Sequence, residues 1–128
     1  MTPLKFASLW LPVAIYMAAI FHFSAQSTLP GAVGGISDTV LHTTAYGGLA
    51  LVSLRAVAGG QWVGVTLAAL VFAWVMATAY GATDEWHQMH TPGRNAELRD
   101  LANDAIGAAV AVGLAGAWGI MRRSSRAQ

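Results

Sequence analysis

An aspartate, a histidine and a tyrosine recur at intervals of four residues in the first half of the chain, as Asp38, His42 and Tyr46. Residues four apart lie on the same face of a helix, so the three side chains are expected to form one stripe. A carboxylate beside an imidazole can orient the ring and activate it as a general base. The alternatives are that Asp38 caps the helix N-terminus and that His42 makes a packing hydrogen bond to another helix. The spacing alone leaves both interpretations open.

A second group of ionisable residues lies in segment 84–104. This segment holds seven of the chain's thirteen charged residues and two of its four histidines, whereas segments 62–83 and 105–121 contain no charge. Ionisable groups at the ends of membrane-spanning helices are costly, so they commonly mark a functional site. The contrast therefore predicts a polar site at one membrane surface.

Within this segment, Asp84 and Gln88 are one helical turn apart and Glu85 lies beside Asp84. Adjacent carboxylates repel each other unless a cation, a proton or an arginine lies between them. Arg94 is close in sequence, and its planar guanidinium suits a carboxylate or a phosphate. We therefore expect Asp84 or Glu85 to act as an acid or a cation ligand, and Arg94 to hold an anionic group. The alternative is a solvated, salt-bridged loop.

The last apolar segment begins with polar residues at Asp100, Asn103 and Asp104. At the level of the membrane, Asn103 and Asp104 must find partners on other helices. Gly107 lies on the same face and begins a series of small residues that permit close helix packing. Between the two polar groups, Glu97 and Arg99 are expected to form a salt bridge at the surface.

No metal site is assigned from the sequence. His87 and His90 could join Asp84 or Glu85 as ligands, but their spacing matches no standard zinc motif. The absence of cysteine excludes disulfides, thiol catalysis and thiolate metal sites. The identity of any cofactor is left unknown.

The composition predicts an all-α integral membrane protein. Only 10% of the residues are charged and 55% are hydrophobic, against roughly a quarter charged in ordinary soluble domains. A chain of 128 residues can hold one domain, so residues 1–128 are expected to form a single unit in a lipid bilayer. A net charge of +1 and scattered basic residues give no indication of nucleic-acid binding.

Four segments are expected to cross the membrane as helices, since about 20 mostly apolar residues are needed for one crossing. They are 6–23, 38–55, 62–85 and 100–121. Pro30-Gly31, Gly59-Gly60 and Pro92-Gly93 mark the loops between them. The second segment is the weakest, because His42, two threonines and Tyr46 interrupt it. Segment 6–23 resembles a signal peptide, because Lys5 precedes its apolar residues. The apolar stretch is longer than in most signal peptides and is followed by a poor cleavage site, so we expect the segment to remain as a helix.

The distribution of lysine and arginine predicts the orientation in the membrane, because cytoplasmic loops carry an excess of both. Two basic residues, Arg94 and Arg99, lie on the side that contains segments 24–38 and 84–104. The other five lie on the opposite side: Lys5, Arg55, Arg122, Arg123 and Arg126. We therefore expect cytoplasmic N- and C-termini and an outward-facing polar site.

Four motifs in order resemble the VanZ-like family over about residues 21–113. They are Phe23-Ser24-Ala25-Gln26; Asp38, His42, Tyr46 and Leu49; Asp84-Glu85, Gln88 and Pro92-Gly93-Arg94; and Asp100, Asn103 and Gly107. Members of this family are small bacterial integral membrane proteins, and the founding member confers resistance to the lipoglycopeptide antibiotic teicoplanin. The chain departs from the family at Thr39, where a lysine is common. Any anion contact made by that lysine must come here from Arg94 or Arg99, or be absent.

The resemblance and the residue chemistry together give two sets of candidate site residues. The catalytic candidates are His42, Asp38, Glu85 and Asp84, with His42 as a base oriented by Asp38 or Asp100. The substrate-binding candidates are Gln26, Tyr46, Gln88, Arg94, Asp100 and Asn103.

The expected function is to bind or modify a cell-envelope component, either lipid-linked or a glycopeptide, as a multi-pass protein of the bacterial inner membrane. Whether the protein is an enzyme is left open. One alternative is a small transporter or ion-relay element, which with four helices would require a homo-oligomer. The other is a non-catalytic membrane scaffold. The sequence identifies neither the ligand nor the oligomeric state.

Overall fold

The computed structural model describes residues 1–26, 35–93 and 95–126, and the regular structure within these ranges is entirely helical. Its four helices are α1 (Pro3–Ser24), α2 (Asp38–Val57), α3 (Leu67–Gln88) and α4 (Leu98–Arg126). Three of them, α1, α3 and α4, are long enough and apolar enough to cross a membrane. The expectation of an all-α fold with four helices is confirmed.

Hydroxyl side chains cap the first three helices. Thr2, Ser37 and Thr66 each accept a hydrogen bond from the backbone N–H three residues ahead, which satisfies a donor that the helix leaves free. Ser37 therefore holds the cap position expected for Asp38. Asp38 lies in the first turn of α2, where its charge still favours the positive end of the helix dipole.

The third helix differs from its predicted range of 62–85. It begins at Leu67, because Thr66 caps it and Gly64 adopts a φ of +78°, which lies outside the right-handed helical region. It continues to Gln88, so the three residues after Glu85 are helical. This extension keeps Asp84, Glu85 and Gln88 on one rigid element.

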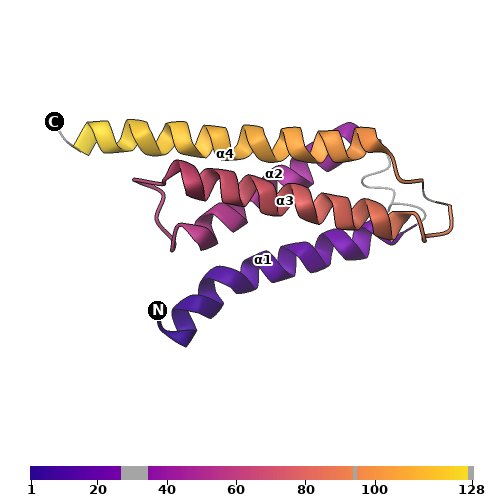
Figure 1. Ribbon diagram of the computed structural model, residues 1–128, viewed down its shortest axis with the longest axis horizontal. Coiled ribbons are helices and arrows are strands. Elements are labelled where there is room, and N and C mark those ends of the chain that lie inside the picture. The colour runs from indigo at the N-terminus through magenta and orange to yellow at the C-terminus, as the bar shows by residue number, and fades with distance from the viewer. Residues whose placement is uncertain (27–34, 94, 127–128) are drawn as a thin grey trace.

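Helix α2 lies at the centre of the bundle. It contacts all three other helices, whereas α1 packs against α2 and α3 and diverges from α4 toward its N-terminus (Figure 1). Because neighbouring helices cover part of α2, its polar residues Tyr46 and Ser53 are buried and His42 is half-buried, whereas Asp38, Thr39 and Thr44 are exposed. This position explains why α2 is absent from the apolar spans found in the described residues.

Glycines bring α2 and α4 into close contact. A Cβ atom at Gly107 would collide with the backbone of Thr43, and one at Gly47 would lie 3.2 Å from the carbonyl oxygen of Gly107. Contact between α4 and α3 has the same origin, since a Cβ at Gly81 would lie 2.6 Å from Oδ2 of Asp104. Small residues at these points allow the polar side chains between the helices to meet.

An arginine compensates for the proline inside α1. Pro12 has no N–H, so the carbonyl of Ser8 loses its helical hydrogen-bond donor. Nη1 of Arg55, near the end of α2, donates to that carbonyl at 3.2 Å. A second bond, from the Tyr80 hydroxyl to the carbonyl of Met17 at 2.7 Å, joins α3 to α1. These two bonds fix α1 to the other helices.

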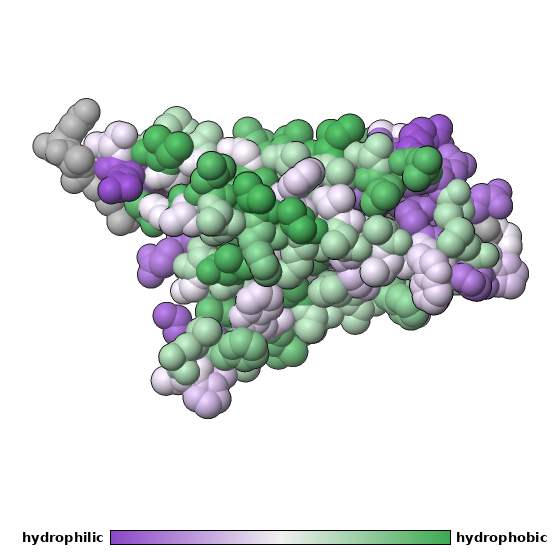
Figure 2. Space-filling view, in the orientation of Figure 1, coloured by the Kyte–Doolittle hydropathy of each residue, from purple (hydrophilic) through white to green (hydrophobic). Residues whose placement is uncertain are grey.

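Charges separate along the bundle axis. All six acidic residues lie where α1 and α3 end and α2 and α4 begin, whereas Lys5, Arg55, Arg122 and Arg123 lie toward the opposite end. Hydrophilic residues gather at the ends of the molecule and hydrophobic ones cover the surface between them (Figure 2). The N-terminus and the end of α4 lie at this basic end (Figure 1). This distribution is that of a membrane protein with its polar groups at the two surfaces.

Candidate functional site

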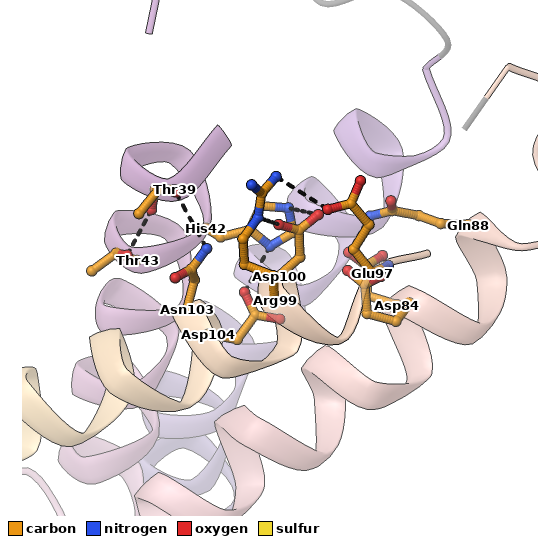
Figure 3. Close-up of polar contacts among 11 residues, drawn as sticks. Thr39, His42, Thr43, Asp84, Gln88, Glu97, Arg99, Asp100, Asn103 and Asp104 are labelled. Carbon is orange, nitrogen blue, oxygen red and sulfur yellow. Dashed lines mark hydrogen bonds and ion pairs between the residues drawn. The ribbon is translucent and has the colours of Figure 1, made fainter. Parts of the chain in front are cut away.

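His42 lies between two aspartates of α4. Its Nδ1 is 2.7 Å from Oδ1 of Asp104, and its Nε2 is 3.7 Å from Oδ2 of Asp100 (Figure 3). Since an ionised carboxylate only accepts hydrogen bonds, Nδ1–H donates to Asp104. Asp38 is exposed in the first turn of α2, and no hydrogen bond joins it to His42 among the described contacts. Asp104, rather than Asp38, orients the ring.

Four carboxylates are buried around this histidine. The exposed fraction is 4% for Asp84, 7% for Glu85, 7% for Asp100 and 0% for Asp104. Within the described part of the chain, each of the four has one buried oxygen that lacks a hydrogen-bond partner. Buried charges are normally paired, and buried polar atoms normally have partners. The four carboxylates and their unpartnered oxygens therefore form the candidate site.

The last turns of α3 supply one side of this cluster. Gln88 donates from Nε2 to Oδ2 of Asp84 at 3.4 Å, across one helical turn. Oε2 of Glu85 accepts from the backbone N–H of Glu97 at 3.0 Å. This bond joins the end of α3 to the residue just before α4.

The first turns of α4 supply the other side. Asp100 and Asp104 are one turn apart, so both carboxylates reach the same ring on α2. Asn103 donates to the hydroxyl of Thr39 at 3.4 Å, which fixes the rotation of α4 against α2. Thr39 thus binds Asn103 at the position where the resemblance led us to note a missing lysine.

An amphiphilic cavity of about 340 Å³ lies between α1, α2 and α3 beside the cluster. Its polar lining comes from both α2 and α3 and from the end of α1. Its apolar lining comes mainly from the second half of α1. The tyrosine ring of Tyr46 lies nearly parallel to that of His42, with 6.2 Å between centroids. The full lining is Tyr16, Ala19, Ile20, Phe23, Ser24, Asp38, Leu41, His42, Ala45, Tyr46, Asp84 and Gln88.

Several sequence-predicted residues lie away from this centre. Gln26 contacts the His22 ring at 3.2 Å and is not part of the cavity lining. Arg94 lies outside the described residues. His87 stacks on Phe21 and His90 bonds the carbonyl of Trp86, so neither joins the buried carboxylates. The expected Glu97–Arg99 salt bridge forms at the surface, at 3.1 Å.

Asp104 is the central residue of this cluster. It was expected only to find a partner on another helix, which its contact with His42 confirms, and it is not among the predicted catalytic or substrate-binding residues. It is fully buried and forms the shortest polar contact to His42. Two signals in the sequence identify it: it follows Asp100 by one helical turn, and it is the last charge before the apolar segment 105–121. An aspartate so placed must bond to another helix.

A family model described as VanZ/LLP1 matches residues 8–119. The match covers most of the chain and includes the histidine, the four buried carboxylates and the residues that line the cavity. No curated protein and no solved structure matches the chain.

Proposed function

Because the chain belongs to the VanZ/LLP1 family, we propose that it binds or modifies an amphiphilic component of the bacterial cell envelope. The ligand class is a lipid-linked intermediate or a lipoglycopeptide of the teicoplanin type. The cavity carries this proposal, because it combines an apolar wall on α1 with polar groups on α2 and α3. Ligand sites of this kind are mostly apolar, with a few convergent polar groups.

In the bound state, the apolar chain of the ligand lies along Ile20 and Phe23, and its polar head lies near His42, Tyr46 and Gln88. Arg94 is proposed to hold an anionic group on that head. In an enzymatic version, Asp104 holds Nδ1–H of His42, so Nε2 accepts the proton that is removed from a nucleophile. The buried carboxylates then supply an acid.

The proposed location is the inner membrane, with the acidic end facing outward and both termini in the cytoplasm. The basic residues at the end that holds the termini support this orientation. They also support a multi-pass topology in which α2 crosses within the other three helices.

The buried polar residues argue against an ion relay through the bundle. Among the described residues, the buried polar side chains outside the acidic end include the hydroxyls of Ser53 and Thr78, and no buried charged side chain lies there. A relay requires a continuous path of polar groups across the membrane. In the described residues, the halves of α3 and α4 nearer the basic end do not provide such a path. This observation favours a site that opens to one side.

A binding experiment tests the proposal directly. The protein in lipid nanodiscs is titrated with a polyprenyl phosphate and, separately, with teicoplanin, and binding is measured by native mass spectrometry. Ala45→Phe fills the cavity and is expected to weaken binding of the active ligand at least tenfold. Ala109→Phe, on an exposed face of α4, is the matched control and should bind as the wild type does. Equal binding by both variants, or no binding of either ligand by the wild type, contradicts the proposal.

A cellular measurement tests the link to teicoplanin and the role of His42. Expression of the wild-type chain in a susceptible bacterium should raise the inhibitory concentration of teicoplanin. His42→Ala, expressed at the same level and folded, should abolish that increase. If this variant protects as the wild type does, His42 has no chemical role.

A further inference from the structure

Three residues from three helices could coordinate one cation. His42 of α2, Glu85 of α3 and Asp100 of α4 each offer a ligand atom, and these atoms all lie within 4.8 Å of one another. We propose that His42, Glu85 and Asp100 bind a divalent cation, which Asp104 stabilises through the histidine ring. This site goes beyond the proposed amphiphile binding and does not depend on it. When the ion is bound, Nε2 of His42 is a metal ligand and cannot also be the base of the enzymatic version.

The distances fit a common ion better than they fit a direct hydrogen bond. Nε2 of His42 and Oδ2 of Asp100 are 3.7 Å apart, which is too long for a hydrogen bond. Two ligand atoms at about 2.1 Å from a tetrahedral ion lie about 3.4 Å apart, by the geometry of zinc sites. A movement of a few tenths of an ångström would bring both atoms to coordination distance.

The histidine is held in the form that a metal ligand requires. Nδ1–H donates to Asp104 at 2.7 Å, which leaves the lone pair of Nε2 directed toward Asp100. Metal-binding histidines commonly donate their second N–H to a carboxylate in this way, which fixes the tautomer and strengthens the ligand. Asp104 is fully buried, so this bond is protected from water.

Unpartnered oxygens provide an independent indication of a ligand. Oε1 of Glu85 and Oδ1 of Asp100 are buried without hydrogen-bond partners among the described residues, and both residues are 7% exposed. Such atoms are costly unless an ion or another donor satisfies them. A bound cation accounts for both oxygens at once.

The local charge also favours a cation. Four buried carboxylates surround one histidine, and among the described lysines and arginines only Arg99 reaches one of them, at 4.0 Å from Oδ1 of Asp100. The Arg99 side chain is 67% exposed and pairs with Glu97 instead. A divalent ion between the carboxylates would replace their mutual repulsion with attraction.

The ligand set selects the class of ion. One imidazole with two carboxylates is a mixed nitrogen and oxygen set, which suits Zn²⁺ or Mn²⁺. Ca²⁺ and Mg²⁺ prefer oxygen ligands alone, so both should bind more weakly.

Calorimetry on the full chain tests the proposal. The protein is purified without a histidine tag, stripped with a chelator and titrated in detergent with Zn²⁺ and with Mn²⁺. We expect one ion per chain for at least one of the two metals. Glu85→Gln and Asp100→Asn should each weaken its binding at least tenfold, and Asp104→Asn by about 10- to 100-fold, the usual effect of removing a residue that orients a metal ligand. Glu97→Gln, whose side chain pairs at the surface, is the matched control and should bind as the wild type does.

A measurement on the wild type alone removes the risk that a variant fails to fold. Co²⁺ is added to the stripped wild-type protein in place of Zn²⁺. Its visible absorption then reports directly whether nitrogen and oxygen ligands bind the ion. The proposal is overturned if neither Zn²⁺ nor Mn²⁺ binds the wild type at one ion per chain. It is also overturned if a folded Glu85→Gln variant binds the metal with unchanged affinity. Because no amphiphile is present, failure here leaves the cavity experiment unaffected.

Discussion

His42 is the residue on which the polar site depends, because it joins α2 to α4 through an aspartate that no solvent reaches. A hydrogen bond to a charged group contributes about 1.5–3 kcal/mol to stability, and a buried partner left alone costs a similar amount. Each member of the pair therefore stabilises the other. The same pair sets which nitrogen of the ring remains for chemistry.

A double-mutant cycle on His42→Ala and Asp104→Ala should give a coupling energy of about 1.5–3 kcal/mol, by the usual strength of hydrogen bonds to charged groups. The measurement is the free energy of unfolding in mixed detergent micelles. Glu97→Ala paired with Arg99→Ala is the control, since an exposed ion pair contributes about 1 kcal/mol or less. Additivity of the His42 and Asp104 changes within about 0.5 kcal/mol contradicts the pairing.

At the scale of elements, the close approach of α2 and α4 decides whether His42 and Asp104 meet at all. Gly107 sits against the backbone of Thr43, which follows His42 directly in the chain. Backbone cannot move aside as the end of a side chain can. Any side chain at position 107 must therefore push the two helices apart.

Gly107→Ala is expected to lower the free energy of unfolding by about 1–3 kcal/mol, the usual cost of overpacking. It should also weaken metal binding, because the His42–Asp104 distance increases. Gly113→Ala on the same helix meets nothing within 4 Å and should be neutral or stabilising by up to about 1 kcal/mol. Thermal unfolding and the calorimetric titration of both variants provide the comparison, and equal effects at the two positions would refute the argument.

The carbonyl of Ser8, which lacks its helical donor because Pro12 has no N–H, gives a second prediction about helix packing. Arg55→Met should destabilise the protein by about 1–2 kcal/mol, since it removes a charged donor from the carbonyl of Ser8. In a Pro12→Ala background the same change should cost less, because the substituted alanine has a backbone N–H that bonds this carbonyl within α1. Unfolding free energies of the four proteins test this, and an equal cost of Arg55→Met in both backgrounds is the contrary result.

Length and hydropathy were sufficient to predict α1, α3 and α4, because each apolar segment is about as long as a membrane crossing. The prediction of α2 also needed the four-residue spacing of Asp38, His42 and Tyr46. They did not locate the start of α3, which depends on the conformation of Gly64 and on the cap at Thr66. For the site, the four-residue spacing predicted that Asp38, His42 and Tyr46 lie along one helix. The partner of His42 depends on how α4 is rotated against α2, and that rotation follows from contacts such as Asn103 with Thr39, which no single segment encodes.

At the scale of the whole molecule, the excess of lysine and arginine at one end sets the expected orientation in the membrane. The chain contains no cysteine, so single cysteines can report the exposure of each end. Asn95 and Ser125 are both exposed and lie at the acidic and basic ends.

In spheroplasts, Asn95→Cys should react with a membrane-impermeant maleimide, whereas Ser125→Cys should react only after permeabilisation. This outcome follows from basic residues remaining on the cytoplasmic side. Labelling is measured by a mass shift on gels, with the cysteine-free wild type as background. The reverse pattern would show that the acidic end faces the cytoplasm.

The gathering of all six acids at one end also bears on how the membrane potential acts on the protein. Moving one elementary charge across the whole potential involves about 2.3 kcal/mol per 100 mV. A cation that reaches His42, Glu85 and Asp100 from the nearer surface crosses only a small fraction of that field. Its occupancy should therefore follow the ion concentration on that side and stay nearly constant when the cell loses its potential, whereas transport through the bundle would stop.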